Sequence, residues 1–294
     1  MRRINLAFTL VELLVVIAII SIVAAVLFPI FVGAKGLAYR ESCASNLHQI
    51  SLAGAAYSTD YDDRFMPINY QPASTPNSRN DRTWVQMLLP YVKDFAIFRC
   101  PADFTGRPQS EATFDQDLVP GDADSQYYTA SQRSNYGYNF QNLAPIVKTP
   151  AGWMAEPRET TVVADPGNTI MYMDSVWSRL PSGTPSGGGS WLVVPPCRYY
   201  EPTAAGVPAV DSFTGIVKTV SNVYTTTYGW EPGSPNASNI YGGAWPWHLG
   251  RLNVAEVDGS VHSLDPSQLT IGCNVLGQWA GSIRNPAIYM WDIK

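Results

Sequence analysis

The first sixty residues carry the clearest pattern of apolar and polar positions in the chain. Residues 6–32 are strongly apolar, Glu12 is the only charged residue among them, and the twenty residues from Leu13 to Val32 carry no charge. A helix of that length spans roughly 30 Å, the thickness of the hydrocarbon core of a bilayer. The pattern predicts one membrane crossing. An unpaired Glu12 carboxylate would cost on the order of 3 kcal/mol there, and a lone helix supplies no partner.

Beyond residue 32 the apolar residues recur mostly every three or four positions, which predicts an amphipathic helix that continues to about residue 60. The first helix therefore divides into a transmembrane half, residues 8–32, and an amphipathic half, residues 33–61, which packs against a head made of residues 62–294. The apolar stripe consists of Leu37, Ala44, Leu47, Ile50, Gly54, Tyr57 and Tyr61. The polar face consists of Lys35, Arg40, Glu41, Asn46 and Gln49.

Short apolar runs predict the regular elements of the head. A helix is expected over residues 84–90, where Pro90 ends it. Strands are expected from residue 136, over residues 161–165 and over residues 169–174. These strands predict a small antiparallel sheet.

Two long segments of the head have loop composition. Residues 104–135 are polar, and residues 176–247 are rich in Gly, Pro, Ser and Thr, with a hairpin expected over residues 216–228. The aromatic residues of the second segment could stack on sugar rings, but packing within the insertion is the favoured interpretation. They are Trp191, Tyr199, Tyr200, Tyr228, Trp230, Tyr241, Trp245 and Trp247.

A carboxyl-terminal hairpin is expected over residues 252–264. Asp258-Gly259 joins two β-prone runs and favours a two-residue type I′ turn, in which both central residues have positive φ. This turn pairs Val257 with Ser260. It places four side chains on one face, namely those of Leu252, Val254, Glu256 and Val261.

Composition limits the classes of partner. The formal charge of the 294 residues is -5. Nucleic acid is not an expected partner, because phosphate binding depends on clustered Lys and Arg.

The four cysteines permit three full pairings, and the sequence leaves free thiols open as well. Disulfides are allowed if the head lies outside the cytoplasm. The preferred pairing joins Cys43 to Cys100 and Cys197 to Cys273.

The amino terminus resembles that of type IV prepilins and type II secretion pseudopilins. The resemblance rests on Arg2 and Arg3 followed by Ala7-Phe8-Thr9-Leu10-Val11-Glu12, and on Pro29 within the first helix. It implies that a prepilin peptidase cuts between Ala7 and Phe8, removing a leader of residues 1–7 and methylating the amino group of Phe8. It also implies that Glu12 pairs with the amino terminus of a neighbouring subunit in a filament. The family usually has Gly before the cut, whereas this chain has Ala7.

Cleavage of this kind changes the charge. The leader contains two of the 19 basic residues and none of the 24 acidic ones, so the mature chain has 17 basic residues and a formal charge of -7.

Two simpler interpretations compete with this one. A secretory signal could be cleaved near Val23-Ala24-Ala25, although its apolar core would be too long and would begin with an acid. The other interpretation is a plain single-pass membrane anchor, which would not require Glu12. Arg2 and Arg3 on one side and Lys35 and Arg40 on the other give only a weak orientation signal.

A second resemblance lies near the carboxyl end, where His248 is followed by nine residues and then Asp258-Gly259. This spacing is similar to the processing-associated motif of a subgroup of prepilin-like proteins. Further matches to that subgroup are Ser42-Cys43, Asn46-Leu47, Gln49-Ile50, Asp60-Tyr61, Tyr91, Cys100-Pro101 and Asp103. We expect a structural role, with His248 hydrogen-bonded at the hairpin and Asp258 serving its turn.

Enzyme activity is not expected, because the sequence contains neither a Gly-x-Ser-x-Gly elbow nor a His-Glu-x-x-His pair. No metal or other cofactor is expected either. The one alternative is Ca²⁺, bound either by oxygens near Asp258 or by Asp60, Asp62 and Asp63. For the second group, a solvated helix end with Arg64 nearby is the favoured interpretation.

The sequence thus predicts an α+β, pilin-like chain with a long first helix on a small antiparallel sheet and long loop insertions. The resemblance implies a single-pass protein of the cytoplasmic membrane with its head outside, which joins a pilus or pseudopilus with like subunits. The alternative is a membrane-tethered surface module that binds a glycan or protein through residues 176–247.

Overall fold

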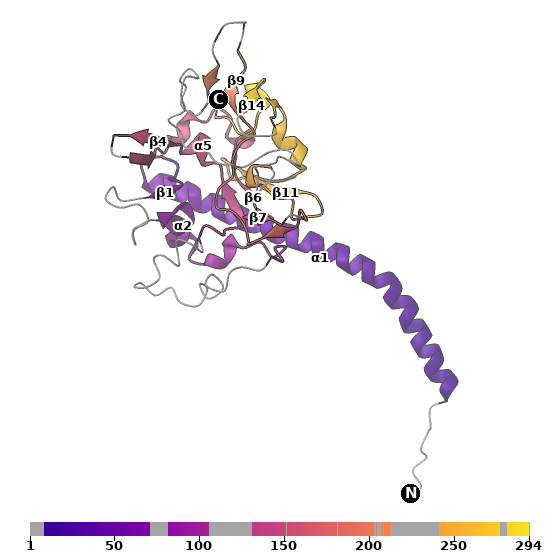
Figure 1. The fold of residues 1–294 in the computed structure, drawn as a ribbon. Coiled ribbons are helices and arrows are strands. Elements are labelled where there is room, and N and C mark those ends of the chain that lie inside the picture. Colours follow the sequence, from indigo (N-terminus) through magenta and orange to yellow (C-terminus); the bar gives the residue numbers. More distant parts are fainter. Residues whose placement is uncertain are drawn as a thin grey trace.

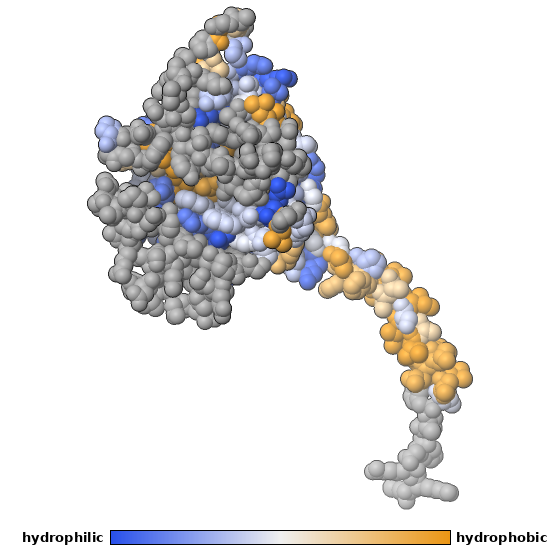
Figure 2. Space-filling view, in the orientation of Figure 1, coloured by the Kyte–Doolittle hydropathy of each residue, from blue (hydrophilic) through white to orange (hydrophobic). Residues whose placement is uncertain are grey.

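A single long helix dominates the shape of the molecule. The computed structural model describes residues 9–70, 82–105, 131–150, 152–180, 182–202, 204, 207, 209–212, 241–276 and 281–293. Helix α1 (Leu10–Asp60) has 51 residues, and its first half projects away from the head that holds its second half (Figure 1). Apolar side chains cover the visible face of the projecting half (Figure 2). A long helix followed by a head of small sheets confirms the α+β fold class.

Local chemistry explains where α1 begins and ends. Thr9 caps its first turn, and Tyr61 closes the last turn by donating its N–H to the carbonyls of Tyr57 and Ser58. The next two residues, Asp62 and Asp63, have φ of 55° and 53°, in the left-handed region that no helix can continue through.

The second half of α1 packs on the head along the predicted stripe. Leu47, Ile50, Gly54 and Tyr57 are buried. Leu37 and Tyr61 were expected on the same stripe, but they are 46% and 54% exposed, because the buried residues of α1 all lie between Cys43 and Ser58.

One residue of the expected polar face turns inward. Asn46 was predicted to face solvent, yet its amide donates to the carbonyl of Arg99 and to the hydroxyl of Tyr136. Gly54 lets the helix approach the sheet, because a Cβ there would lie 2.9 Å from the hydroxyl oxygen of Tyr172.

The central sheet lies against α1. Its strands are β3 (Tyr136–Tyr138), β6 (Ile170–Asp174), β11 (Leu252–Glu256) and β12 (Val261–Leu264), in the antiparallel order β12-β11-β6-β3. The strands predicted from residue 136 and over residues 169–174 are therefore confirmed. The third prediction, a strand over residues 161–165, is wrong. A short 3₁₀ helix, η3 (Thr160–Val162), stands there because Thr160 donates to the carbonyl of Asp63 and turns the chain.

Both faces of this sheet are covered. The face toward α1 carries Ala255 and Tyr172, which join a core with Leu47 and Trp84. The other face carries Leu252 and Val254, which join a second core around Trp291. Burying each of these larger side chains contributes about 1.5–3 kcal/mol, so the sheet is the central layer that links the two cores.

The carboxyl-terminal hairpin forms, but its predicted register is wrong. Ala255 pairs with Val261, and Glu256 donates its N–H to the carbonyl of Ser260, so the loop has three residues, 257–259, instead of two. In that loop Gly259 alone has positive φ, 88°, and its N–H bonds the carbonyl of Glu256. This is a type I turn with a glycine bulge, which moves Val261 to the face of Ala255 and away from Val254.

A type I′ turn occurs nearby, at a place that the sequence did not indicate. Leu249 and Gly250 have φ of 54° and 82°. His248 and Arg251 on either side exchange two backbone hydrogen bonds of 3.0 Å. This turn leads the chain into β11.

A second sheet was not predicted. It contains β9 (Cys197–Tyr200), β10 (Val210–Asp211), β13 (Cys273–Asn274) and β14 (Gly281–Ile283), in the order β10-β9-β14-β13. The pair β14 and β9 is parallel, whereas the other pairs are antiparallel. The segment 176–247 therefore contributes strands as well as loops, and the hairpin expected at 216–228 lies outside the described residues.

Smaller elements complete the head. Helix α2 (Trp84–Val92) continues past Pro90 and is closed by Lys93, whose φ is 62°, so the predicted end at Pro90 is wrong by two residues. The remaining strands are the pairs β1 (Asn69–Tyr70) with β2 (Arg82–Thr83), β4 (Ile146–Thr149) with β5 (Gly152–Ala155), and β7 (Ser178–Arg179) with β8 (Pro185–Ser186). The remaining helical turns are η1 (Phe95–Phe98), α5 (Phe140–Leu143), η4 (Pro166–Asn168), η5 (Tyr241–Gly243), η6 (Pro266–Thr270) and η7 (Pro286–Ile288).

Candidate functional site

Glu12 has a hydrogen-bond partner within its own chain. Its carboxylate oxygen Oε2 accepts the backbone N–H of Thr9 at 2.9 Å and the Thr9 hydroxyl at 2.7 Å. In return the Thr9 hydroxyl oxygen accepts the N–H of Glu12 at 3.2 Å. This reciprocal pair is a capping box, and it satisfies backbone donors that the first helical turn leaves open. The expectation that a lone helix offers Glu12 no partner is therefore wrong.

The apolar residues of α1 from Leu13 to Val32 are exposed in the described part of the chain. Helix α1 is long and apolar enough to cross a membrane, and its most apolar stretch is not buried at all. The predicted cut between Ala7 and Phe8 lies outside the described residues, which begin at residue 9.

His248 is buried and bonded to a carboxylate that the sequence analysis missed. The His248 ring nitrogen Nε2 lies 3.2 Å from Oδ2 of Asp174, with side-chain exposures of 1% and 0%. The same Asp174 oxygen accepts the backbone N–H of Asn253 at 2.7 Å. Burial raises the pKa of Asp174, and the bond to His248 opposes that rise.

The His248 ring also touches a disulfide. Its Nε2 lies 3.6 Å from Sγ of Cys100, which is bonded to Cys43 with a Cα separation of 5.3 Å. His248 Nδ1 and Asp174 Oδ1 have no hydrogen-bond partner among the described residues. The pair is buried, and the neighbouring sulfur is part of a disulfide instead of a free nucleophile.

The signal for Asp174 was present in the sequence. It ends the apolar strand residues Ile170–Met173, and a carboxylate at the end of a buried strand needs a donor in the folded head. What the sequence did not reveal is which donor, because His248 is far away along the chain.

Asp258 and Gly259 form a turn at the other end of β11. The exposed Asp258 carboxylate accepts the N–H of Ser260 at 2.8 Å and its hydroxyl at 2.5 Å, and these bonds lower the pKa of Asp258. The five residues of β11 separate this turn from His248 by roughly 17 Å, at about 3.3 Å per residue. The structure does not bring the two ends of the motif together into one site.

Helix α1 contacts the same turn. The exposed ring of His48 on α1 lies with Nδ1 2.9 Å from the carbonyl oxygen of Gly259. At the other end of β11, the Asn253 amide donates to the carbonyl of Arg40. Both ends of the motif therefore lie on strands and turns that fasten the head to α1.

The second disulfide fastens the outer sheet. Cys197 on β9 is bonded to Cys273 on β13, with a Cα separation of 5.9 Å. Ring closure of this kind restricts the unfolded chain and stabilises the head.

Candidate metal ligands lie at one place that was not predicted and at the predicted end of α1. Cys43, Cys100 and His248 lie within 4.8 Å of one another, but both sulfurs are in the disulfide and so are not thiolate ligands. At the end of α1, Asp60 accepts the Tyr91 hydroxyl at 2.8 Å. Arg64, expected near these acids, lines one pocket with Asp62 and pairs with Glu159 at 3.1 Å.

Comparison with known protein families decides what the amino terminus is. A model described as the prokaryotic N-terminal methylation motif matches residues 2–28. The chain carries a prepilin N-terminal methylation motif. Together with the long apolar helix, the motif fits a type IV pilin-like or pseudopilin-like protein. Neither curated proteins nor solved structures give a significant match to the chain.

The match ends at residue 28. The resemblance carried by His248 and Asp258-Gly259 lies outside it and stays a prediction. The matched motif is typical of structural subunits rather than enzymes.

Proposed function

We propose that this chain is a pilin-like structural subunit. In this proposal a prepilin peptidase cuts between Ala7 and Phe8 and methylates Phe8. The mature chain then joins like subunits in a type IV pilus or a type II secretion pseudopilus through α1. Before assembly it lies in the cytoplasmic membrane as a single-pass protein, with its head in the periplasm or at the cell surface.

The observation that carries this proposal is the division of α1 into two halves. The described residues of the apolar half are exposed on all sides, while the second half is fixed to the head by its buried stripe. A helix that is apolar all round needs lipid or other helices around it. One continuous helix therefore couples a packing surface for a membrane or filament to a folded head.

The methylation motif supports the processing step. Removing residues 1–7 places a new amino terminus at Phe8, directly before the Thr9 cap. Glu12 lies in the first turn, where a negative charge is stabilised by the helix dipole. We propose that its carboxylate also neutralises the amino terminus of the next subunit during assembly.

The disulfides agree with a head outside the cytoplasm. Cys43–Cys100 joins α1 to the segment after η1, and Cys197–Cys273 joins two strands of the outer sheet. Such bonds persist in oxidising compartments.

The test separates the charge of Glu12 from its role as a helix cap. Glu12→Gln keeps an N3 side chain that can complete the capping box but removes the charge. Thr9→Ala is the matched control, because it removes the cap and keeps the charge. Each variant is expressed in cells that assemble the filament, and the readouts are membrane insertion, the mass of the amino-terminal peptide and incorporation into filaments.

We expect Glu12→Gln to insert and be cleaved normally but to be lost from filaments, and Thr9→Ala to be incorporated. Wild-type incorporation of Glu12→Gln would overturn the role of the charge. An exported chain that keeps Met1, or that begins after Ala25, would overturn the processing step. Absence of any filament, with normal export, would favour a membrane-tethered binding module.

A further inference from the structure

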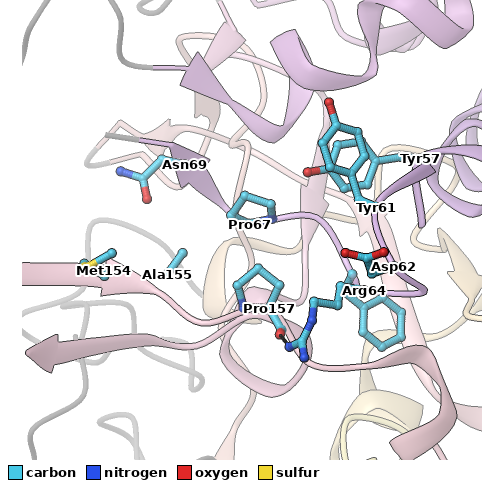
Figure 3. Close-up of a pocket in the computed structure, with 10 residues that line it drawn as sticks. Tyr57, Tyr61, Asp62, Arg64, Pro67, Asn69, Met154, Ala155 and Pro157 are labelled. Carbon is cyan, nitrogen blue, oxygen red and sulfur yellow. Dashed lines mark hydrogen bonds between the residues drawn. The ribbon is translucent and has the colours of Figure 1, made fainter. Parts of the chain in front are cut away.

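A pocket of about 420 Å³ lies at the end of α1 that is embedded in the head. That volume is within the range of about 300–1,000 Å³ that is usual for small-molecule sites. The pocket is formed where the end of α1, the segment leading to β1 and the end of β5 meet (Figure 3). Its lining consists of Tyr57, Tyr61, Asp62, Arg64, Phe65, Pro67, Asn69, Met154, Ala155 and Pro157.

Two stacked tyrosines form one wall of the pocket. The rings of Tyr57 and Tyr61 lie 4.2 Å apart with an interplanar angle of 13°. Tyr57 is 7% exposed, and the edge-to-face ring of Tyr91 supports it from another side. Burial raises the pKa of Tyr57 to about 12, so its hydroxyl stays neutral. Tyr61 is held by this stack yet is 54% exposed, which makes it a rigid aromatic surface open to solvent.

Hydrogen-bonding groups stand beside the aromatic wall. Asp62 follows Tyr61 directly, and its backbone φ of 55° is one that non-glycine residues seldom adopt. Its carboxylate lies between Tyr61 and Arg64 in Figure 3, and the Asn69 amide lines the same pocket. Arg64 is already held, because its guanidinium donates to the carbonyl of Pro157 and to Glu159.

The charges around the pocket disfavour an anion. Asp62 lines the pocket, Asp60 and Asp63 lie near Asp62 in the sequence, and the lining residue Arg64 is paired with Glu159. An aromatic face attracts C–H groups that carry partial positive charge, whereas a carboxylate and an amide suit hydroxyl groups. A neutral sugar ring offers both, an apolar C–H face and several hydroxyls.

The pocket lies far from the membrane-spanning half of the chain. The 28 residues from Val32 to Asp60 separate them by about 42 Å along the helix, at 1.5 Å per residue. In Figure 1 the neighbouring strands β1 and β4 stand at the end of the head opposite to the projecting helix. A ligand could therefore reach the pocket while the first half of α1 is in a membrane.

We propose that this pocket binds a neutral sugar ring, which stacks on Tyr61 while its hydroxyl groups bond to Asp62. The site needs the folded head alone, so it does not depend on the proposed assembly.

The test uses the disulfide-bonded full chain in a detergent without a sugar headgroup. Saturation-transfer NMR and calorimetry measure binding of neutral oligosaccharides of glucose, galactose and N-acetylglucosamine, with uronic acid oligomers as the anionic comparison. Tyr61→Ala removes the exposed ring, and Tyr61→Phe is the matched control that keeps it. Asp62→Asn removes the charge and retains hydrogen bonding and tolerance of positive φ.

We expect at least one neutral oligosaccharide to bind and the uronic acids not to bind. Tyr61→Ala should weaken the neutral interaction about tenfold, while Tyr61→Phe should stay within about threefold of the wild type. Asp62→Asn should reduce the difference in affinity between the neutral oligosaccharides and the uronic acids. Circular dichroism melting of each variant verifies that the head is folded.

Three results would overturn the proposal. They are no binding of any neutral sugar by the folded wild type, equal binding by Tyr61→Ala, and a preference for the anionic sugars.

Discussion

The buried carboxylate of Glu256 makes the stability of the head depend on pH in a way that one substitution removes. Glu256 ends β11 with its side chain 2% exposed. Its oxygen Oε2 accepts the Ser260 hydroxyl at 3.0 Å and lies 3.6 Å from Nε2 of the more exposed His262. Burial outweighs these partners and raises the pKa of Glu256 from 4.5 to about 7.

The sign follows from proton binding. Between pH 4.5 and 7 the folded head keeps a proton that the unfolded chain has lost, so stability falls as pH rises through this window. The stability that protonated Glu256 contributes is fully present below pH 4.5 and is lost above pH 7. At about 1.4 kcal/mol for each pH unit, the loss amounts to about 3 kcal/mol.

Glu256→Gln replaces the carboxylate with a neutral amide that can still accept the Ser260 hydroxyl. We expect its free energy of unfolding at pH 8 to exceed that of the wild type by up to about 3 kcal/mol, and to converge with the wild type near pH 4. The measurement is urea denaturation of the full chain in detergent from pH 4 to pH 8. Glu41→Gln is the control, since the Glu41 side chain is 69% exposed.

Two outcomes would refute this reasoning. The first is a Glu256→Gln variant that is less stable than the wild type at pH 8. The second is a variant that keeps the wild-type fall in stability between pH 4.5 and pH 7.

Two further predictions concern backbone geometry and use thermal melting as the assay. Gly189→Ala should destabilise the head by about 3 kcal/mol or more, because its Cβ would fall on the backbone of Ser134. Gly33→Ala is the control and should not destabilise, since nothing lies within 4 Å; equal melting of the two variants would contradict the packing argument. Leu249→Asn should stabilise the head by about 1 kcal/mol, because Asn tolerates a φ of 54° better than Leu. A lower melting temperature would mean that the contact of Leu249 with Gly36 outweighs this strain.

Features that depend on neighbouring residues were predicted well. The apolar run and the three-to-four spacing predicted α1 almost to its ends, and short β-prone runs predicted β6 and β11. The turn at Asp258-Gly259 was predicted in place but not in type. Asp258-Gly259 is compatible with a two-residue and with a three-residue loop. Which loop forms depends on how β11 pairs with its neighbouring strands in the sheet.

Contacts between distant residues were not predicted. Asp174 was only the end of a strand in the sequence, and His248 only part of a spacing, until the fold placed them 3.2 Å apart in the core. The pocket likewise combines the end of α1 with Met154 and Pro157 from a later segment. Nothing in the local pattern of either segment indicates that they meet.

The sequence by itself determined the long helix, its apolar half and the motif at its start, because these follow from interactions between residues within a few turns of one another. Only the tertiary structure decided the register of the hairpin, the second sheet, the burial of Asp174 and Glu256, and the pocket beside Tyr61. Each of these depends on side chains that the chain brings together from far apart, and no local pattern records which partners they meet.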